Sequence, residues 1–199
     1  MVDDDEAVRD SLQALLEGQG HSVKTFATAE EFLADNPYSR TDCAIVDLQM
    51  PGMDGMTLLS RLKANGALFP VIMVTGHGDV SLAVQAMKFG AADFIEKPYG
   101  REAILDLIRQ AVKREASSDA AGQERAGAMA LIASLTPRER EVLEGLVAGR
   151  PNKIIAYQLG ISPRTVEIHR ANLVKKMHAD SLSHLVRLAL AAGIDAAIR

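Results

Sequence analysis

The first half of the chain alternates short continuous apolar runs with longer segments in which apolar residues recur every three or four positions. The continuous runs predict buried β-strands. Such runs occur at residues 43–47 and 70–75, and short strands also fit residues 22–26 and 93–96. The periodic segments predict amphipathic helices, which are expected at residues 8–16, 28–36, 54–65, 79–89 and 101–115. Strands that alternate with helices indicate an α/β fold, with a doubly wound parallel sheet covered on both faces.

The second half of the chain carries helix signals without strand signals. Thr136 and Pro137 form a strong helix start, because Thr136 can cap the helix and Glu139 can reach back to the cap residue. After this helix the sequence predicts a second helix over 152–159, followed by a tight turn and a third helix that begins at Pro163. Two short helices joined by a three-residue turn are typical of a helix-turn-helix.

A change of composition separates the two halves. Residues 116–134 mix alanines with polar residues, which predicts a linker that is helical in part. We therefore expect an α/β domain over 1–115 and a separate all-α domain over 135–199.

A last helix over 182–192 is apolar around most of its circumference. It either covers the core of the second domain or adds a dimer surface.

Composition and charge narrow the functional classes. The 199 residues are 48% hydrophobic and 24% charged, and no apolar run is long enough to span a membrane, so we expect a cytoplasmic protein without a membrane partner. The single cysteine, Cys43, excludes an intramolecular disulfide.

Residues 1–115 hold 11 basic against 18 acidic side chains, whereas residues 135–199 hold 10 against 6. The acidic half suits metal binding or regulation, and the basic half suits nucleic acid.

Five polar residues lie at the carboxyl ends of predicted strands: Asp3, Asp4, Asp47, Thr75 and Lys97. Because parallel strands end at the same edge of a sheet, we expect these side chains to converge there. Carboxylates beside an open position suit Mg²⁺, with Asp4 and Asp47 as direct ligands. With the metal and Lys97 neutralising a phosphoryl group, Asp47 can act as a nucleophile, and the Thr75 hydroxyl can donate to the phosphoryl oxygens. The alternative is a set of salt-bridged surface acids.

The helix that begins at Pro163 has two different faces. Val166, Leu173 and Met177 recur on one side at helical spacing and are expected to be buried. The opposite side carries Arg164, Glu167, Ile168, Ala171, Asn172 and Lys175. Residues 163–178 hold four basic side chains against one acid. This composition fits entry into the major groove of DNA, and the alternative is a solvated basic face.

Four segments resemble the receiver domain of bacterial two-component response regulators, and the FixJ branch in particular. They are VDDDEAVR, VDLQMPGMDG, VTGHGDV and GAADFIEKPY. The resemblance covers residues 1 to about 115 and implies a flavodoxin-like sheet of five parallel strands. It identifies Asp47 as the phosphoacceptor, Asp3 and Asp4 as the acidic pair that serves Mg²⁺, and Lys97 as the phosphate-binding lysine.

The same resemblance implies roles for residues near this site. The main-chain carbonyl of Gln49 would complete the metal shell, and Thr75 and Phe94 match the switch pair of the family. Phe94 also fits a plain core position. The side chains of Gln49 and His77 lie where similar receivers line the path of the hydrolytic water, so we expect them to tune the lifetime of the phosphoryl group.

One departure from the receiver family concerns the first strand. The family carries several apolar residues before its acidic pair, whereas this chain has Met1 and Val2 there. We expect either that the natural chain begins upstream or that the sheet is weakened at its middle. The placement of Asp3 and Asp4 depends on which of the two holds.

A second resemblance covers residues 135–199. The stretch LTPREREVLEGLVAGRPNKIIAYQLGISPRTVEIHRANLVKKM is similar to the LuxR-type DNA-binding domain. This makes 163–178 the recognition helix. It implies that Glu167, Ile168 and Ala171 face bases, that Lys153, Arg164 and Thr165 face phosphates, and that Lys175 belongs to the same DNA-facing side. Pro151 replaces a serine that is usual in the family, which removes a possible cap or phosphate contact.

These interpretations predict a transcription regulator and not an enzyme that turns over external substrates. Phosphorylation of Asp47 by a sensor histidine kinase is expected to drive homodimerisation and binding to promoter DNA, with activation of transcription through RNA polymerase. One alternative is a DNA-binding regulator that is never phosphorylated and whose receiver is a dimerisation scaffold. An aspartyl-phosphate phosphatase is disfavoured, because such enzymes carry a second Asp where this chain has Gln49.

Overall fold

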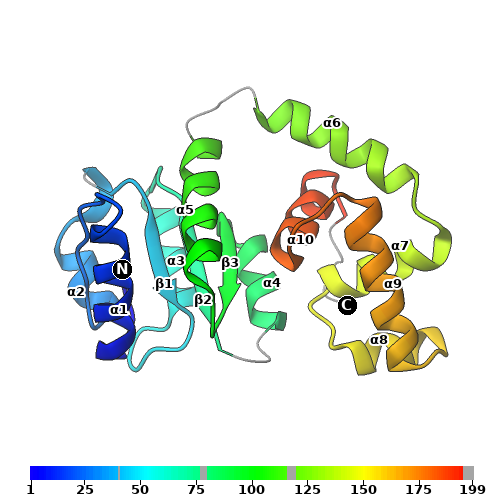
Figure 1. Ribbon diagram of the computed structural model, residues 1–199, viewed down its shortest axis with the longest axis horizontal. Coiled ribbons are helices and arrows are strands. Elements are labelled where there is room, and N and C mark those ends of the chain that lie inside the picture. Colours follow the sequence, from blue (N-terminus) through cyan, green and yellow to red (C-terminus); the bar gives the residue numbers. More distant parts are fainter. Residues whose placement is uncertain (40, 77–79, 116–119, 195–199) are drawn as a thin grey trace. The chain divides into compact units, whose positions relative to one another are not determined.

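The structure of the protein is a computed structural model that describes residues 1–39, 41–76, 80–115 and 120–194 (Figure 1). Its contacts form two compact units, Met1–Asp79 with Phe89–Ala116 and Val80–Lys88 with Ser117–Arg199. One hydrophobic cluster lies in the α/β part of the chain, and another joins the helices of the second half.

A parallel sheet lies at the centre of the first unit. Its strands follow the order β1-β2-β3, with the bounds Ala44–Asp47, Val71–Thr75 and Asp93–Glu96. Asp47 pairs with Val74, and Thr75 pairs with Glu96, so the carboxyl ends of the strands lie side by side. β1 and β2 are buried along their whole length, which agrees with the continuous apolar runs that predicted them.

Two further strands of the predicted sheet are each reduced to a single bridging residue, Val2 in one and Phe26 in the other. Val2 forms parallel bridges with Val46 on one side and with Phe26 on the other. The N–H of Asp3 donates to the carbonyl of Phe26 at 3.2 Å. The five-stranded doubly wound order is therefore present and runs from Phe26 through Val2 to β1, β2 and β3. The strand predicted over 22–26 is wrong in extent, because among these described residues Phe26 alone forms a strand bridge. The Lys24 carbonyl only accepts a hydrogen bond from the amino group of Met1 at 2.6 Å.

Helices cover both faces of this sheet. In Figure 1, α5 lies in front of the sheet and α3 lies behind it. Leu12 and Leu16 of α1 and Ile104 of α5 form one core with Ile72 of β2. The helices of the chain up to residue 115 are α1 (Glu6–Glu17), α2 (Ala29–Ala34), the 3-10 helix η1 (Pro37–Ser39), α3 (Gly55–Ala64), α4 (Val80–Lys88) and α5 (Arg101–Glu115).

The second half of the chain is helical where the structure describes it. Its helices are α6 (Ala120–Ala133), α7 (Pro137–Val147), α8 (Asn152–Leu159), α9 (Pro163–Lys176) and α10 (Leu182–Ala191). The Thr136 hydroxyl accepts from the N–H of Glu139, and the Glu139 carboxylate accepts from the N–H of Thr136, which confirms the capping box. Gly160 ends α8 with a left-handed φ of 64°, and the chain turns directly into α9. The predicted helix-turn-helix is thus observed.

The segment predicted as a linker adds residues to the core of the second unit. Ala128 and Ile132 of α6 are buried in one cluster with Leu143 of α7 and Leu185 of α10. This packing explains why an alanine-rich segment with little amphipathic pattern holds a helix there. Along the described residues, no helix combines the length and the apolar character needed to cross a membrane.

Candidate functional site

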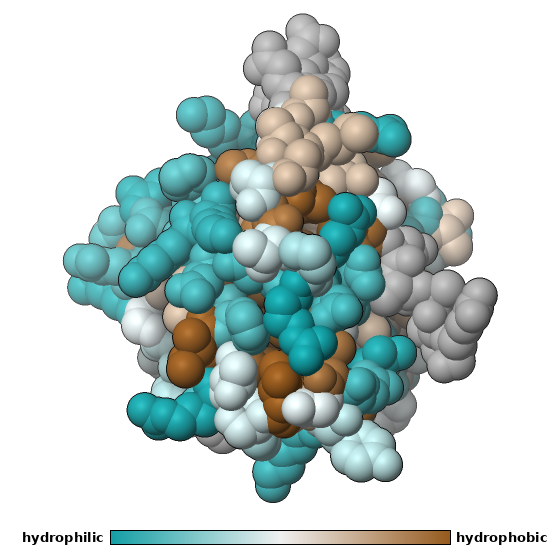
Figure 2. Space-filling model, turned by 90° about the vertical axis from the view of Figure 1, so that its right-hand side faces the viewer, coloured by the Kyte–Doolittle hydropathy of each residue, from teal (hydrophilic) through white to brown (hydrophobic). Residues whose placement is uncertain are grey.

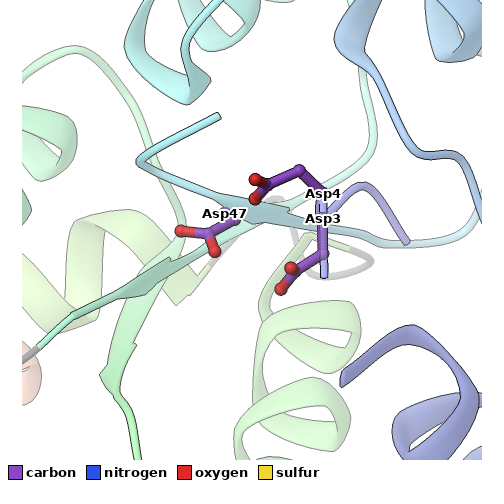
Figure 3. A group of neighbouring side chains, drawn as sticks. All are labelled: Asp3, Asp4 and Asp47. Carbon is purple, nitrogen blue, oxygen red and sulfur yellow. The ribbon is translucent and has the colours of Figure 1, made fainter. Parts of the chain in front are cut away.

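Three carboxylates meet at the carboxyl end of β1. Asp47 is the last residue of β1, and Asp3 and Asp4 follow Val2 on the neighbouring line of the sheet. Figure 3 shows the three side chains at this edge, and one oxygen of each lies within 4.8 Å of the others. Asp3 is fully buried and Asp47 is 8% exposed, whereas Asp4 is open to solvent. The structure thus brings together the acids that the sequence placed at one edge.

Lys97 supplies the positive charge of this cluster. It follows β3, where its N–H donates to the carbonyl of Thr75 at 2.8 Å. Its Nζ donates to Oδ2 of Asp3 at 2.8 Å and to Oδ2 of Asp47 at 2.6 Å. One ammonium group therefore bridges two carboxylates that would otherwise repel each other.

The burial and charges of the cluster change the protonation equilibria of two groups. Burial raises the pKa of Asp47 by more than the hydrogen bonds from Lys97 and from the Gln49 N–H lower it. Burial alone would lower the pKa of Lys97, but the hydrogen bonds and charges of Asp3 and Asp47 outweigh it and raise the pKa. Lys97 is accordingly a fixed cation, and Asp47 is a more basic carboxylate than one in water.

Backbone groups hold the two buried acids in place. The Gln49 N–H donates to Oδ1 of Asp47 at 3.1 Å, and the Asp5 N–H donates to Oδ1 of Asp3 at 3.0 Å. Gly55 lets α3 begin against the end of β1, because a Cβ there would lie 2.2 Å from the carbonyl oxygen of Asp47. The acids therefore have fixed positions before any ligand arrives.

Thr75 and Phe94 lie on the strands next to the cluster. Thr75 is buried, and its hydroxyl donates to the carbonyl of Gly76 at 3.0 Å. Phe94 is also buried, as the core interpretation of this residue expects. His77, for which the sequence predicted a position near the hydrolytic water, lies outside the described residues.

The donor set of the cluster fits a hard divalent cation. Carboxylate oxygens are the ligands that Mg²⁺ prefers, and Mg²⁺ usually keeps several of its waters. Exposed Asp4 opens the cluster to solvent, while buried Asp3 and Asp47 fix its inner side. The residues present therefore suit a partly hydrated Mg²⁺.

A second candidate site is the outward face of α9. Val166, Leu173 and Met177 are fully buried, which confirms the predicted inner face. The opposite side is exposed at Arg164, Glu167, Ile168, Ala171, Asn172 and Lys175, and Thr165 is half-buried beside it. Lys153 of α8 is exposed as well.

Side-chain contacts cap the start of α9 and join its middle to α8. The Ser162 hydroxyl accepts from the Thr165 N–H at 3.1 Å and lies 2.8 Å from the Thr165 hydroxyl. Nη1 of Arg170 donates to Oδ1 of Asn152, at the start of α8, at 3.1 Å. Pro151 caps α8 without a side-chain hydrogen bond, as its replacement of a serine predicted. Helix α9 is thus capped at its start and tied to α8 near its middle.

Sequence reasoning missed the role of Lys176. Its Nζ donates to the Glu139 carboxylate at 2.7 Å and so joins the end of α9 to the start of α7. The hydrogen bonds from Lys176 and Thr136 lower the pKa of Glu139 to about 2. The capping box located Glu139, but it gave no signal for a partner so distant in the sequence.

Sequence reasoning also gave no role to Tyr157 of α8, whose side chain is 87% exposed. Tyr157 lies one turn after Lys153 on the same helix. Figure 2 presents hydrophobic residues set among hydrophilic ones on one face of the molecule. Exposed aromatic side chains of this kind are common where a surface meets a partner.

Comparisons with known proteins assign a family to each half of the chain. A family model described as the response regulator receiver domain matches residues 1–109, and one described as bacterial regulatory proteins of the luxR family matches residues 133–189. The transcriptional regulatory protein FixJ of Bradyrhizobium diazoefficiens is 49% identical over 98% of this chain and 95% of its own length. FixJ of Azorhizobium caulinodans is 51% identical over 98% and 92%.

A solved structure is similar over almost the whole chain. The crystal structure of full-length FixJ from B. japonicum is 48% identical, covers 97% of this chain and 95% of its own, and has a TM-score of 0.57. Both family models and both relatives point to the same architecture. The chain belongs to the FixJ/NarL-type response regulators, which are transcription regulators that combine a receiver domain with a LuxR-type helix-turn-helix domain for DNA binding.

Proposed function

We propose that Asp47 accepts a phosphoryl group from a sensor histidine kinase and that this modification controls promoter binding. The observation that carries the proposal is the geometry around Asp47. Lys97 Nζ lies 2.6 Å from its carboxylate, and Asp3 and Asp4 complete a carboxylate cluster within 4.8 Å. Three acids and one bridging cation are more than a structural ion pair requires.

The chain's own residues supply most of the chemistry of the transfer. A carboxylate oxygen of Asp47 attacks phosphorus, the bond from phosphorus to the donor imidazole nitrogen breaks, and an aspartyl phosphate forms. Lys97 already contacts this carboxylate, so its ammonium group needs a small movement to reach a phosphoryl oxygen. A bound Mg²⁺, held by Asp3, Asp4, Asp47 and the main-chain carbonyl of Gln49, would neutralise phosphoryl charge.

The switch would act through the residues next to Asp47. The Thr75 hydroxyl, which donates to a main-chain carbonyl in this structure, would turn to a phosphoryl oxygen. Phe94 would adjust its ring in response, and the receiver surface around β3 would change with it. We propose that two receivers dimerise through this surface.

The output is binding of the second domain to promoter DNA. Glu167, Ile168 and Ala171 would face bases, which their exposure on α9 supports. Lys153, Arg164, Thr165 and Lys175 would serve phosphates and the edge of the groove. We propose that the dimer activates transcription and contacts RNA polymerase in the cytoplasm.

One observation favours a second candidate function. The strand that carries Asp3 and Asp4 bridges its neighbours at Val2 and ends with the hydrogen bond from the Asp3 N–H to the Phe26 carbonyl, so Asp4 lies beyond its last contact. If metal and phosphoryl group do not bind there, the receiver would serve as a dimerisation scaffold for a regulator that binds DNA without phosphorylation.

Phosphoryl transfer to the full chain separates these candidates. The chain is incubated with acetyl phosphate and Mg²⁺, and its intact mass is measured. We expect the mass of one phosphoryl group on the wild type and none on Asp47→Asn. Asp54→Asn is the matched control, because Asp54 is a nearby acid that caps α3 through the Thr57 N–H at 2.7 Å. Equal labelling of Asp47→Asn would contradict the proposal.

A further inference from the structure

The outward face of α9 carries a single acid among basic side chains. Glu167 is exposed, and it lies one turn after Arg164 and one turn before Arg170. Arg170 is engaged elsewhere, because it donates to Asn152 at 3.1 Å. Across the residues that the structure describes, no hydrogen bond or ion pair involves the Glu167 carboxylate. The stability of the domain therefore does not explain why an acid occupies this position.

An acid on a DNA-facing surface lowers affinity unless it meets a donor. The phosphates repel its charge, and removing it from water without a partner is costly. The major groove offers two donors that can offset this cost, the N4 amino group of cytosine and the N6 amino group of adenine. Adenine also presents the N7 acceptor beside its amino group, which repels the second carboxylate oxygen. Cytosine has no acceptor in that place, so a carboxylate favours cytosine.

The residues beside Glu167 strengthen this preference. Ile168 is 55% exposed, and Ala171 is exposed one turn after Glu167. Neither side chain has a hydrogen-bonding group, so neither competes for the cytosine amino group. Their apolar atoms also exclude water, which strengthens a charge-assisted hydrogen bond.

We propose that Glu167 is a specificity-determining residue that selects a cytosine in the operator through the N4 amino group. This inference rests on the proposed function, in which α9 enters the major groove. The negative charge weakens binding to all other sequences, and it thereby raises the ratio of specific to non-specific affinity.

The test compares sequence preference and affinity together. The full-length chain, treated with acetyl phosphate and Mg²⁺, is bound to duplex DNA with a randomised core, and the bound duplexes are sequenced. We expect a fixed cytosine in the motif that the wild type enriches. Glu167→Gln should change this position to adenine, because glutamine pairs with N6 and N7 of adenine. Glu167→Ala should reduce the preference at this position by at least about fivefold.

Affinity for random-sequence DNA gives an independent readout. Both variants should bind such DNA more tightly than the wild type, because the repulsion is removed. Glu144→Gln is the matched control: it removes the same charge from an exposed position on α7 and should leave the motif unchanged.

Two kinds of failure are distinguishable in this experiment. If both Glu167 variants keep the cytosine, or if they change the affinity for every sequence by the same factor, Glu167 acts through its charge alone and the inference is wrong. If the wild-type chain enriches no motif, the proposed DNA-binding function itself fails.

Discussion

Replacing Glu139 by Gln tests the charge contact that joins α7 to α9. Gln at this position can still complete the capping box with Thr136, so the substitution removes mainly the attraction to Lys176. The hydrogen bonds from Lys176 and Thr136 lower the pKa of Glu139 from 4.5 to about 2. A carboxylate with a lowered pKa stabilises the folded state above its unfolded pKa, and this stabilisation is lost as the pH falls toward the folded pKa.

The size of the effect follows from the pKa change and from the exposure of the pair. Each pKa unit corresponds to about 1.4 kcal/mol, so the full change would stabilise the fold by about 3 kcal/mol. The side chain of Lys176 is 41% exposed, against 6% for Glu139, and water therefore screens their attraction. With this screening we expect Glu139→Gln to lower the free energy of unfolding by about 1–2 kcal/mol near neutral pH.

Urea unfolding of the full chain measures the free energy of unfolding. Hydrogen exchange of the amides in α7 and α9, measured separately, shows whether the loss lies in these helices. The difference in the free energy of unfolding between wild type and Glu139→Gln should be largest above about pH 4.5 and should shrink below this pH. Glu144→Gln is the matched control, because Glu144 is 51% exposed and lies 3.5 Å from Arg140, and its effect should stay within about 0.5 kcal/mol. An equal difference at neutral and acidic pH would refute the electrostatic account.

Two further predictions concern the outward face of α9 and the carboxylate cluster around Asp47. Arg164→Ala should weaken binding to all DNA sequences and lower the salt slope of binding by about one unit, which a titration of affinity against salt measures; the same change at Arg140 of α7 should leave the slope unchanged. Gly55→Ala should destabilise the receiver by roughly 1–3 kcal/mol in urea unfolding, because a Cβ would lie 2.2 Å from the Asp47 carbonyl oxygen. Gly100→Ala, where a Cβ would meet no atom within 4 Å, should cause no such loss.

The sequence predicted the convergence of the acids at the carboxyl end of β1 because this geometry follows from a general rule. Parallel strands end at one edge, so acids at the ends of two apolar runs had to meet there. The rule does not give side-chain contacts. The bond of Lys97 to both Asp3 and Asp47 joins residues far apart in the chain, and it depends on register and burial, which spacing alone does not supply.

Helix α9 shows the same division. Helical spacing gave its buried face, because Val166 and Leu173 recur with the period of the helix. Spacing could not predict that Lys176 bonds to Glu139 of another helix. The short strand over 22–26 failed for a different reason, since a strand extends only as far as its partner does.

The most direct test of the account measures DNA affinity of the full chain before and after phosphorylation. A duplex enriched by the wild type is titrated with the chain, with and without acetyl phosphate and Mg²⁺, while the oligomeric state is followed by light scattering. Phosphorylation is expected to produce a dimer with tighter DNA binding, and Asp47→Asn should show neither change. A wild type that carries the phosphoryl group but keeps the same affinity would contradict this expectation.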